Sequence, residues 1–207
     1  MSFSTEQEKF WANEFGDDYI SRNISEQLLA SNVSYFAKAL ARTQKKSSLI
    51  ELGANVGMNI GALKTLLPNS KMTAVEINQQ AATELSNRHP DVDVRNESIL
   101  DFKASTKCDL VFVKGVLIHL NPDALQSVYK MMASSSAKYV LIGEYYNPTP
   151  VSLTYRGHDN RLFKRDFAGE FMDANPEFVL LDYGFSYHRD PLFPQDDINW
   201  FLMEKIS

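Results

Sequence analysis

Short apolar runs that alternate with helical segments constrain the fold of this chain more than any other feature of its sequence. Five such runs predict β-strands: 48-SLIELG-53, 72-MTAVEI-77, 92-VDVRNES-98, 109-DLVFVKG-115 and 138-KYVLIGEY-145. Helical periodicity, bounded by prolines, follows in three of the intervening segments: 57–67, 79–89 and 122–135. Apolar strands separated by helices are typical of a parallel sheet that is covered on both faces. The sequence therefore predicts a doubly wound α/β fold.

The two ends of the chain depart from this alternation. Residues 178–188 and 198–206 predict two closing strands with no helix between them, which indicates an antiparallel hairpin added to the parallel sheet. Residues 1–45 predict a mostly helical N-terminal lid over the carboxyl edge of the sheet. With 207 residues, of which 44% are hydrophobic, we expect a single domain. Its ligand-binding core covers 46–146, and 147–207 add a substrate-side insertion and the closing strands.

Charge, cysteine content and hydropathy exclude several functional classes. The net charge of −5 argues against a basic stripe for nucleic-acid binding. Cys108 is the single cysteine, so neither a disulfide framework nor a multi-cysteine metal site is expected. The sequence shows neither a signal peptide nor an apolar run of membrane-spanning length. We therefore expect a soluble, cytoplasmic protein with no metal, nucleic-acid or membrane partner, whose oligomeric state the sequence does not determine.

The glycines in 49-LIELGANVGMNIG-61 follow the first predicted strand, where open α/β sheets bind ligands. Gly53 permits a tight turn, and Gly57 lets a ligand approach the main chain at the start of the helix. A P-loop is excluded because its lysine is missing. The dinucleotide pattern G-x-G-x-x-G fails at Asn55, which leaves an NAD site as the weaker alternative. Plain turn and packing glycines are the other alternative.

Glu76 ends the second predicted strand, in 74-AVEIN-78. An acidic side chain roughly 20 residues past a glycine turn can accept hydrogen bonds from both ribose hydroxyls of a nucleoside ligand. The alternative is an exposed strand-end carboxylate without a ligand. Together with the glycine turn, this acid favours a ribose-containing ligand.

Four segments resemble, in order and spacing, the motifs of class I S-adenosylmethionine-dependent methyltransferases: 51-ELGANVG-57, 74-AVEIN-78, 97-ESILDF-102 and 109-DLVFVKGVLIHLNPD-123. The resemblance covers about residues 45–205 and implies a Rossmann-like, mostly parallel seven-stranded sheet. More narrowly, three segments resemble the methylases associated with pseudaminic acid biosynthesis: 10-FWANEFGDDYISRN-23, 114-KGVLIHLNPD-123 and 143-GEYYNPTPVSLTYRGHDNRLFKRDF-167.

The resemblance implies S-adenosylmethionine as cofactor, with its methionine over the glycine turn and its ribose on Glu76. Ser98, Ile99 and Asp101 would flank the adenine. Lys114 and Gly115 would line the methionine end. The expected cofactor-binding residues are Tyr19, Arg22, Glu51, Gly53, Ala54, Asn55, Gly57, Glu76, Ile77, Ser98, Ile99, Lys114 and Gly115.

The aromatic and polar N-terminal segment has two interpretations. Arg22 could pair with the cofactor carboxylate, while the rings of Trp11 and Tyr19 shield the sulfonium by cation–π attraction. Otherwise Trp11 and Phe15, at helical spacing, form a buried stripe.

Methyl transfer requires an aligned nucleophile, for which a general base is useful. His119, Glu144 and His158 are the candidates, and for His119 a hydrogen bond to a loop carbonyl is the alternative role. The segment 155–165 gathers positive charge beside the expected site, which favours an anionic acceptor over a merely solvated loop. The expected substrate-binding residues are Tyr145, Tyr146, Tyr155, Arg156, Lys164 and Arg165.

The sequence thus predicts an S-adenosylmethionine-dependent methyltransferase that acts on a small anionic or sugar-type acceptor. The narrower resemblance implies nonulosonic (pseudaminic) acid or surface-glycan biosynthesis. Two alternatives remain: a non-catalytic cofactor-binding module that serves a partner protein, and an NAD-dependent oxidoreductase.

Overall fold

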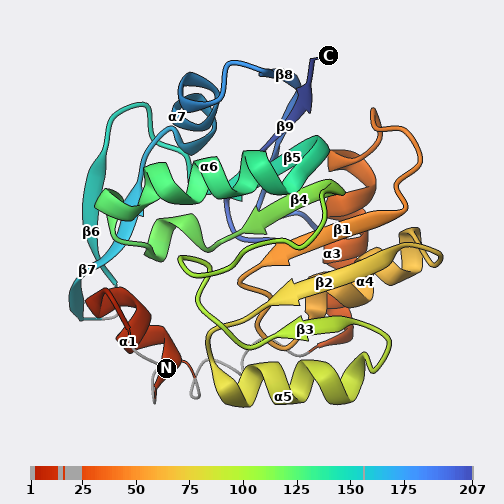
Figure 1. Cartoon of the computed structure of the whole chain (residues 1–207), viewed down its shortest axis with the longest axis horizontal. Coiled ribbons are helices and arrows are strands. Elements are labelled where there is room, and N and C mark those ends of the chain that lie inside the picture. Colours follow the sequence, from red (N-terminus) through yellow and green to blue (C-terminus); the bar gives the residue numbers. More distant parts are fainter. Residues whose placement is uncertain (1–2, 14–15, 17–24, 156, 207) are drawn as a thin grey trace.

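The computed structural model describes residues 3–13, 16, 25–155 and 157–206 of the chain. Its main element is a seven-stranded sheet in the order β3-β2-β1-β4-β5-β9-β8 (Figure 1). Strands β1 to β5 run parallel to one another, whereas β9 runs antiparallel to both β5 and β8. The predicted Rossmann-like sheet with a closing antiparallel hairpin is therefore confirmed.

The strands of this sheet are β1 (Ser48–Leu52), β2 (Lys71–Val75), β3 (Asp93–Arg95), β4 (Cys108–Lys114), β5 (Ser136–Glu144), β8 (Phe178–Ser186) and β9 (Ile198–Lys205). The described helices are α1 (Glu6–Ala12), α3 (Glu26–Ala39), α4 (Met58–Leu66), α5 (Gln79–Arg88), α6 (Leu125–Ser135) and α7 (Phe167–Ala174), with 3-10 turns η1 (Leu117–His119) and η2 (Pro122–Ala124). A separate hairpin consists of β6 (Val151–Tyr155) and β7 (His158–Lys164).

Each face of the sheet has its own apolar core, because alternate residues of a strand point to opposite faces. In β4, Val111 and Val113 belong to the core that contains side chains of α6 and α7. Leu110 and Phe112 belong to the core that contains side chains of α3, α4 and α5. All four are completely buried. Helices thus cover both faces of the parallel sheet.

Two segments differ from the predicted elements. The strand expected over 92–98 is limited to β3, because polar side chains beyond it bond to the main chain and favour a turn. Asn96 Nδ2 donates to the carbonyl of Glu76 at 2.9 Å, and Leu100 N donates to Ser98 Oγ at 3.1 Å. Residues 151–164, for which the sequence predicted no regular element, form the β6–β7 hairpin.

Helix α1 lies beside the β6–β7 hairpin, although the two are far apart in the sequence (Figure 1). Arg161 of β7 forms an ion pair with Glu6 at 3.5 Å, and Gln7 donates to the carbonyl of Asn160 at 3.1 Å. The α1 and hairpin segments therefore form one layer at the edge of the molecule.

The strand order reverses between β1 and β4, and ligands of open α/β sheets bind outside the carboxyl ends of the strands at such a point. Gly53, Glu76, Gly115 and Tyr145 directly follow the ends of β1, β2, β4 and β5. The motifs found in the sequence therefore meet at one edge of the sheet.

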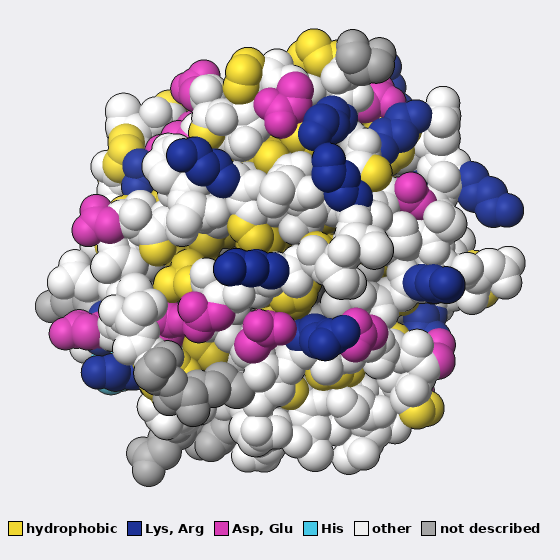
Figure 2. All heavy atoms as spheres, viewed as in Figure 1, with side chains coloured by type: hydrophobic (Ala, Val, Ile, Leu, Met, Phe, Trp, Pro, Cys, Tyr) yellow, Lys and Arg dark blue, Asp and Glu magenta, His cyan; other side chains and the backbone are white. Residues whose placement is uncertain are grey.

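Acidic and basic side chains are interspersed on the face drawn in Figure 2, with apolar side chains between them. Within the described ranges, no helix is both long and apolar enough to span a membrane.

Candidate functional site

The turn between β1 and α4 is built from residues with a left-handed backbone. Gly53, Asn55 and Gly57 have φ values of +75°, +48° and +81°. Such angles cost most L-residues about 1–2 kcal/mol, whereas glycine adopts them freely and asparagine does so more readily than other side chains. Asn55 therefore fits the left-handed conformation that this turn requires.

Bare main chain from two strand ends lines the site. The N–H groups of Gly53 and Ala54 both donate to the carbonyl of Val75, at 2.8 and 3.0 Å, which holds the turn against β2. A Cβ on Gly53 would lie 2.6 Å from Cγ2 of Val116, so the turn fits closely against the segment after β4. At Gly115, with φ of +69°, a Cβ would meet no described atom within 4 Å. The main chain there faces open space.

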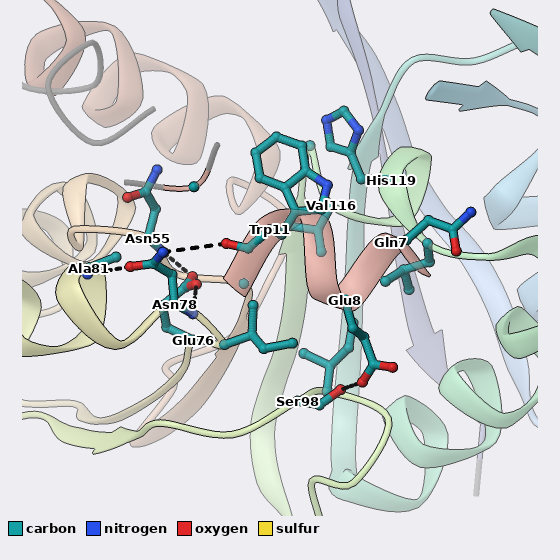
Figure 3. Close-up of a pocket in the computed structure, with 16 residues that line it drawn as sticks. Gln7, Glu8, Trp11, Asn55, Glu76, Asn78, Ala81, Ser98, Val116 and His119 are labelled. Carbon is teal, nitrogen blue, oxygen red and sulfur yellow. Dashed lines mark hydrogen bonds between the residues drawn. The ribbon is translucent and has the colours of Figure 1, made fainter. Parts of the chain in front are cut away.

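Glu76 points from the tip of β2 into this turn (Figure 3). Its Oε2 accepts from Asn55 N and its Oε1 from Asn78 N, both at 2.7 Å. The side chain is only 8% exposed, so the alternative of a solvated strand-end carboxylate is wrong. Burial raises the pKa of Glu76, and the backbone hydrogen bonds act against that rise. A carboxylate has about four acceptor sites, of which two remain for hydroxyl groups of a ligand.

Two cavities meet at the turn. The smaller, of about 130 Å³, lies between α1 and the ends of β1, β2 and β4. The larger, of about 630 Å³, extends toward α3 and the loop before β9. Five residues line both cavities: Gly53, Asn55, Gly115, Val116 and His119.

The expected adenine and ribose residues lie together in the smaller cavity. Glu76 and Ile77 line it from the end of β2, and Ser98 and Ile99 line it from the loop after β3. The structure therefore brings these four residues onto one cavity, and their binding roles remain predictions.

Glu51, at the end of β1, is 1% exposed and incompletely paired. Its Oε1 accepts from Asn59 Nδ2 at 2.7 Å, while its Oε2 has no hydrogen-bond partner among the described residues. Burial raises the pKa of Glu51 to about 8, against the opposing effects of Asn59 and the Lys114 ammonium. A buried carboxyl oxygen without a partner is costly, so this atom suits a hydrogen-bonding group of a ligand.

Lys114 lines the larger cavity from the end of β4. Its ammonium donates to Asn32 Oδ1 and to Gln195 Oε1, each at 3.1 Å. Burial lowers its pKa to about 8, although Glu51 and Asp196 favour the charged form. The end of β4 thus places a cation on the methionine side of the expected site, beside one amide from α3 and one from the loop before β9.

His119 follows β4 and lines both cavities. Its Nδ1 lies 2.7 Å from the carbonyl oxygen of Arg161, and because a carbonyl can only accept, Nδ1 is the donor. The lone pair of the neutral ring is then on Nε2. Its ring centroid is 4.5 Å from that of Trp11 and 5.1 Å from that of Tyr155. Burial lowers the pKa of His119 to about 4, against the hydrogen bond to Arg161. The ring is therefore neutral at pH 7, the form in which Nε2 accepts a hydrogen bond.

The other two candidate bases are placed differently. Glu144 is 2% exposed, and its Oε1 accepts from Val116 N and Leu117 N, each at 2.9 Å. Burial raises its pKa to about 7, against those backbone bonds. His158 lies at the start of β7 with its ring centroid 5.0 Å from that of Phe10. Neither side chain is among the described residues that line the two cavities, so the structure brings only His119 to the cavity wall.

The expected substrate residues are only partly at the site. Tyr145 and Tyr155 line the larger cavity, whereas Tyr146 is 41% exposed and packs against Phe201 at 5.9 Å between ring centroids. The ammonium of Lys164 lies 4.9 Å from the ring centroid of Tyr145.

Two arginines of the basic segment are already paired. Arg161 contacts Glu6, and Arg165 contacts Glu170 at 2.6 Å. They therefore offer less free positive charge to an acceptor than the sequence suggested. Three expected residues, Tyr19, Arg22 and Arg156, lie outside the described residues.

Other residues line the site without having been singled out from the sequence: Gln7, Glu8, Asn32, Asn78, Gln195 and Asp196. Asn32 had a signal, since it is a polar residue on the buried stripe of α3 beside Tyr35 and Phe36. Gln195 comes from an irregular loop, for which no periodicity applies. Trp11 lines the smaller cavity, which favours a role at the site over a purely structural stripe.

The sequence matches no protein-family model and no curated protein. The structure, in contrast, is similar to many solved structures. A magnesium protoporphyrin IX methyltransferase from Synechocystis, solved with bound S-adenosylmethionine, matches with a TM-score of 0.70, 11% identity and coverage of 100% of both chains.

Two further matches differ in the activity that their names state. An S-adenosylmethionine-dependent methyltransferase from Leishmania major has a TM-score of 0.72 and 13% identity, over 98% of this chain and 82% of that one. A sugar N-methyltransferase from Streptoalloteichus has a TM-score of 0.66 and 12% identity, over 95% and 94%. At these identities the likeness establishes a shared fold, which is the Rossmann-like fold of S-adenosylmethionine-dependent methyltransferases.

Proposed function

We propose that this chain is an S-adenosylmethionine-dependent methyltransferase that acts on a small acceptor. The observation that carries the proposal is the buried carboxylate of Glu76, bonded to Asn55 N of the left-handed turn and facing a cavity floored by main chain. The fold shared with methyltransferase structures supports the proposal independently of these residues.

The cofactor suits the hydrogen-bond acceptors, apolar walls and positive charge that line the site. Glu76 retains acceptor sites for two ribose hydroxyls, and Ile77 and Ile99 offer apolar walls to a base. The unpartnered Glu51 Oε2 suits the amino group of the methionine portion, and Lys114 supplies a cation for its carboxylate. The open main chain at Gly115 leaves room beside the junction of the two cavities.

S-adenosylmethionine supplies a methyl group that is already activated for displacement. The chain then has to hold the acceptor in line and exclude water. His119 lines both cavities, and its Nδ1 bond to the Arg161 carbonyl keeps Nε2 available as an acceptor. We infer that Nε2 of His119 accepts the proton of the acceptor group. Glu144 instead stabilises the turn after β4, through two backbone N–H groups.

For the acceptor, the larger cavity favours a polar molecule. Asn32, Asn59 and Gln195 present amide groups there, and Tyr145 and Tyr155 present rings. Amides that hydrogen-bond hydroxyls, beside aromatic faces, suit a sugar. The Lys164 ammonium, 4.9 Å from the ring centroid of Tyr145, suits an anionic substituent. This supports a small sugar-type or anionic acceptor, and nonulosonic acid or surface-glycan biosynthesis rests on the sequence resemblance alone. The single domain over residues 1–207 and the cytoplasmic location also remain predictions.

Calorimetric titration with S-adenosylmethionine, S-adenosylhomocysteine and NAD tests the cofactor. We expect binding of the first two, whereas binding of NAD alone would overturn the proposal in favour of an oxidoreductase. Transfer of a radiolabelled methyl group to a panel of neutral sugars and sugar acids then tests catalysis. Cofactor binding without transfer to any acceptor, together with a stable complex with a partner protein, would favour the non-catalytic module.

A further inference from the structure

Glu8 is a buried carboxylate that the lid helix contributes to the smaller cavity. It lies on α1 and is 4% exposed. Its Oε2 accepts from the N–H and hydroxyl groups of Ser4 and Thr5, at 2.7 to 3.1 Å. Its Oε1 accepts from the hydroxyl of Ser98, in the loop after β3. The two oxygens therefore have different surroundings: Oε2 is surrounded by donors of its own helix start, whereas Oε1 faces the cavity loop.

The Oε1 atom retains acceptor capacity. A carboxylate oxygen has about two acceptor positions, and one hydrogen bond to Oε1 is found among the described residues. Burial raises the pKa of Glu8, but hydrogen bonds from Ser98, Ser4 and Thr5 outweigh that effect and hold it below its ordinary value. The group is therefore an anion at neutral pH, and a donor from a ligand would satisfy it further.

Glu8 and Glu76 occupy separate positions around the smaller cavity (Figure 3). Between them the lining is largely apolar, with Ile77, Ala81 and Ile99 among its residues. A cavity of about 130 Å³ holds on the order of ten water molecules, which is room for a flat purine. With the ribose on Glu76, a purine would extend along this lining, and an adenine presents an exocyclic amine at its far edge.

We propose that the Glu8 carboxylate accepts a hydrogen bond from the exocyclic amine of the cofactor's adenine, so that α1 reads the identity of the base. The inference rests on the proposed function. Ser98, one of the residues expected at the adenine, positions Glu8 through its hydroxyl. The carboxylate that contacts the base thus comes from helix α1, which lies 90 residues before Ser98 in the sequence.

Recognition of the base by α1 has a consequence for the acceptor side. Trp11 lies one helical turn after Glu8, and its ring packs against His119 at the junction of the two cavities (Figure 3). A bound adenine that anchors Glu8 therefore also holds Trp11 against the candidate base.

The test compares S-adenosylhomocysteine with S-inosylhomocysteine, in which a carbonyl replaces the exocyclic amine. A hydrogen bond to a charged group contributes about 1.5–3 kcal/mol, so the wild-type chain should bind the adenosyl compound about 10- to 150-fold more tightly. In Glu8→Gln, the donors of Ser4 and Thr5 fix the amide oxygen at the Oε2 position. The amide NH₂ then faces the base and should reverse the preference toward the inosyl compound.

Glu6→Gln is the matched control, because Glu6 lies on the same helix with an 81% exposed side chain and contacts Arg161 rather than the cavity. It should leave the affinity ratio unchanged. A wild-type chain that binds both compounds equally, or a Glu8→Gln variant that weakens both by the same factor, would overturn the inference and leave only a capping role. Failure of the wild-type chain to bind either compound would instead overturn the proposed function itself.

Discussion

The ribose assignment makes Glu76→Gln the most informative single substitution. The wild-type carboxylate already accepts from Asn55 N and Asn78 N at opposite oxygens, with capacity for one hydroxyl at each. A glutamine keeps the shape but has a single oxygen, so one backbone N–H and one ribose hydroxyl would face an NH₂ group. The substitution also removes the negative charge.

The expected magnitude follows from these contacts. Losing one hydrogen bond to a charged acceptor costs about 1.5–3 kcal/mol of cofactor affinity, which raises Kd about 10- to 150-fold. Leaving one buried N–H unpaired costs about 1–3 kcal/mol of unfolding free energy. Calorimetric titration with S-adenosylhomocysteine measures the first quantity, and urea unfolding measures the second.

A matched control separates the ribose contact from general effects of charge. Glu84→Gln removes a partly exposed carboxylate on α5 that pairs with Arg88, and it should change the Kd less than twofold. The 2′-deoxy analogue of S-adenosylhomocysteine should bind wild type more weakly, yet lose less with Glu76→Gln, because the two changes remove the same interaction. A folded Glu76→Gln variant with wild-type affinity would refute the ribose assignment.

Three further predictions concern the rest of the site. His119→Ala should lower kcat about 10²- to 10⁴-fold. Calorimetry should show an S-adenosylhomocysteine Kd within threefold of wild type. A loss of cofactor affinity as large as the loss of kcat would indicate a structural role instead. The pKa of Glu51 is raised to about 8 in the folded chain from 4.5, so the folded state binds this proton more tightly than the unfolded state. The contribution of the proton to the unfolding free energy is therefore fully present below pH 4.5 and is lost as the pH rises to 8. Urea unfolding at several pH values should show this decline, and Glu51→Gln should reduce it. Gly53→Ala should lower the unfolding free energy more than Gly115→Ala, since both have positive φ but only the first Cβ meets Val116, at 2.6 Å; equal losses would contradict the packing described for the turn.

The parallel part of the fold was predictable because its signals are local. Strand β4 has a continuous apolar run over residues 110–113. Each predicted helix is bounded by a proline or a capping side chain, such as Asn78, which accepts from Ala81 N. The β6–β7 hairpin was not predictable in the same way, because β6 has largely exposed side chains and the segment shows no clear alternation of apolar residues. Its position depends on contacts with α1, which lies about 150 residues away in the sequence.

The site was predictable where residues follow strand ends. Gly53, Glu76 and Gly115 come together because parallel strands place their carboxyl ends at one edge. Glu8 and Gln195 were missed because a helix and a loop from distant parts of the chain carry them to that edge, and neither has a periodic signal. Glu144 was misplaced for a different reason: its position at a strand end suggested the cavity, but its carboxylate turns to the N–H groups of Val116 and Leu117.

The most direct test of the central claim is a crystal structure of the chain with S-adenosylhomocysteine. We expect both ribose hydroxyls to donate to the Glu76 carboxylate at about 2.5–3.0 Å, with the adenosyl group resting on the main chain of Gly53 to Gly57. A ligand bound elsewhere, or ribose hydroxyls that make no contact with Glu76, would contradict the account.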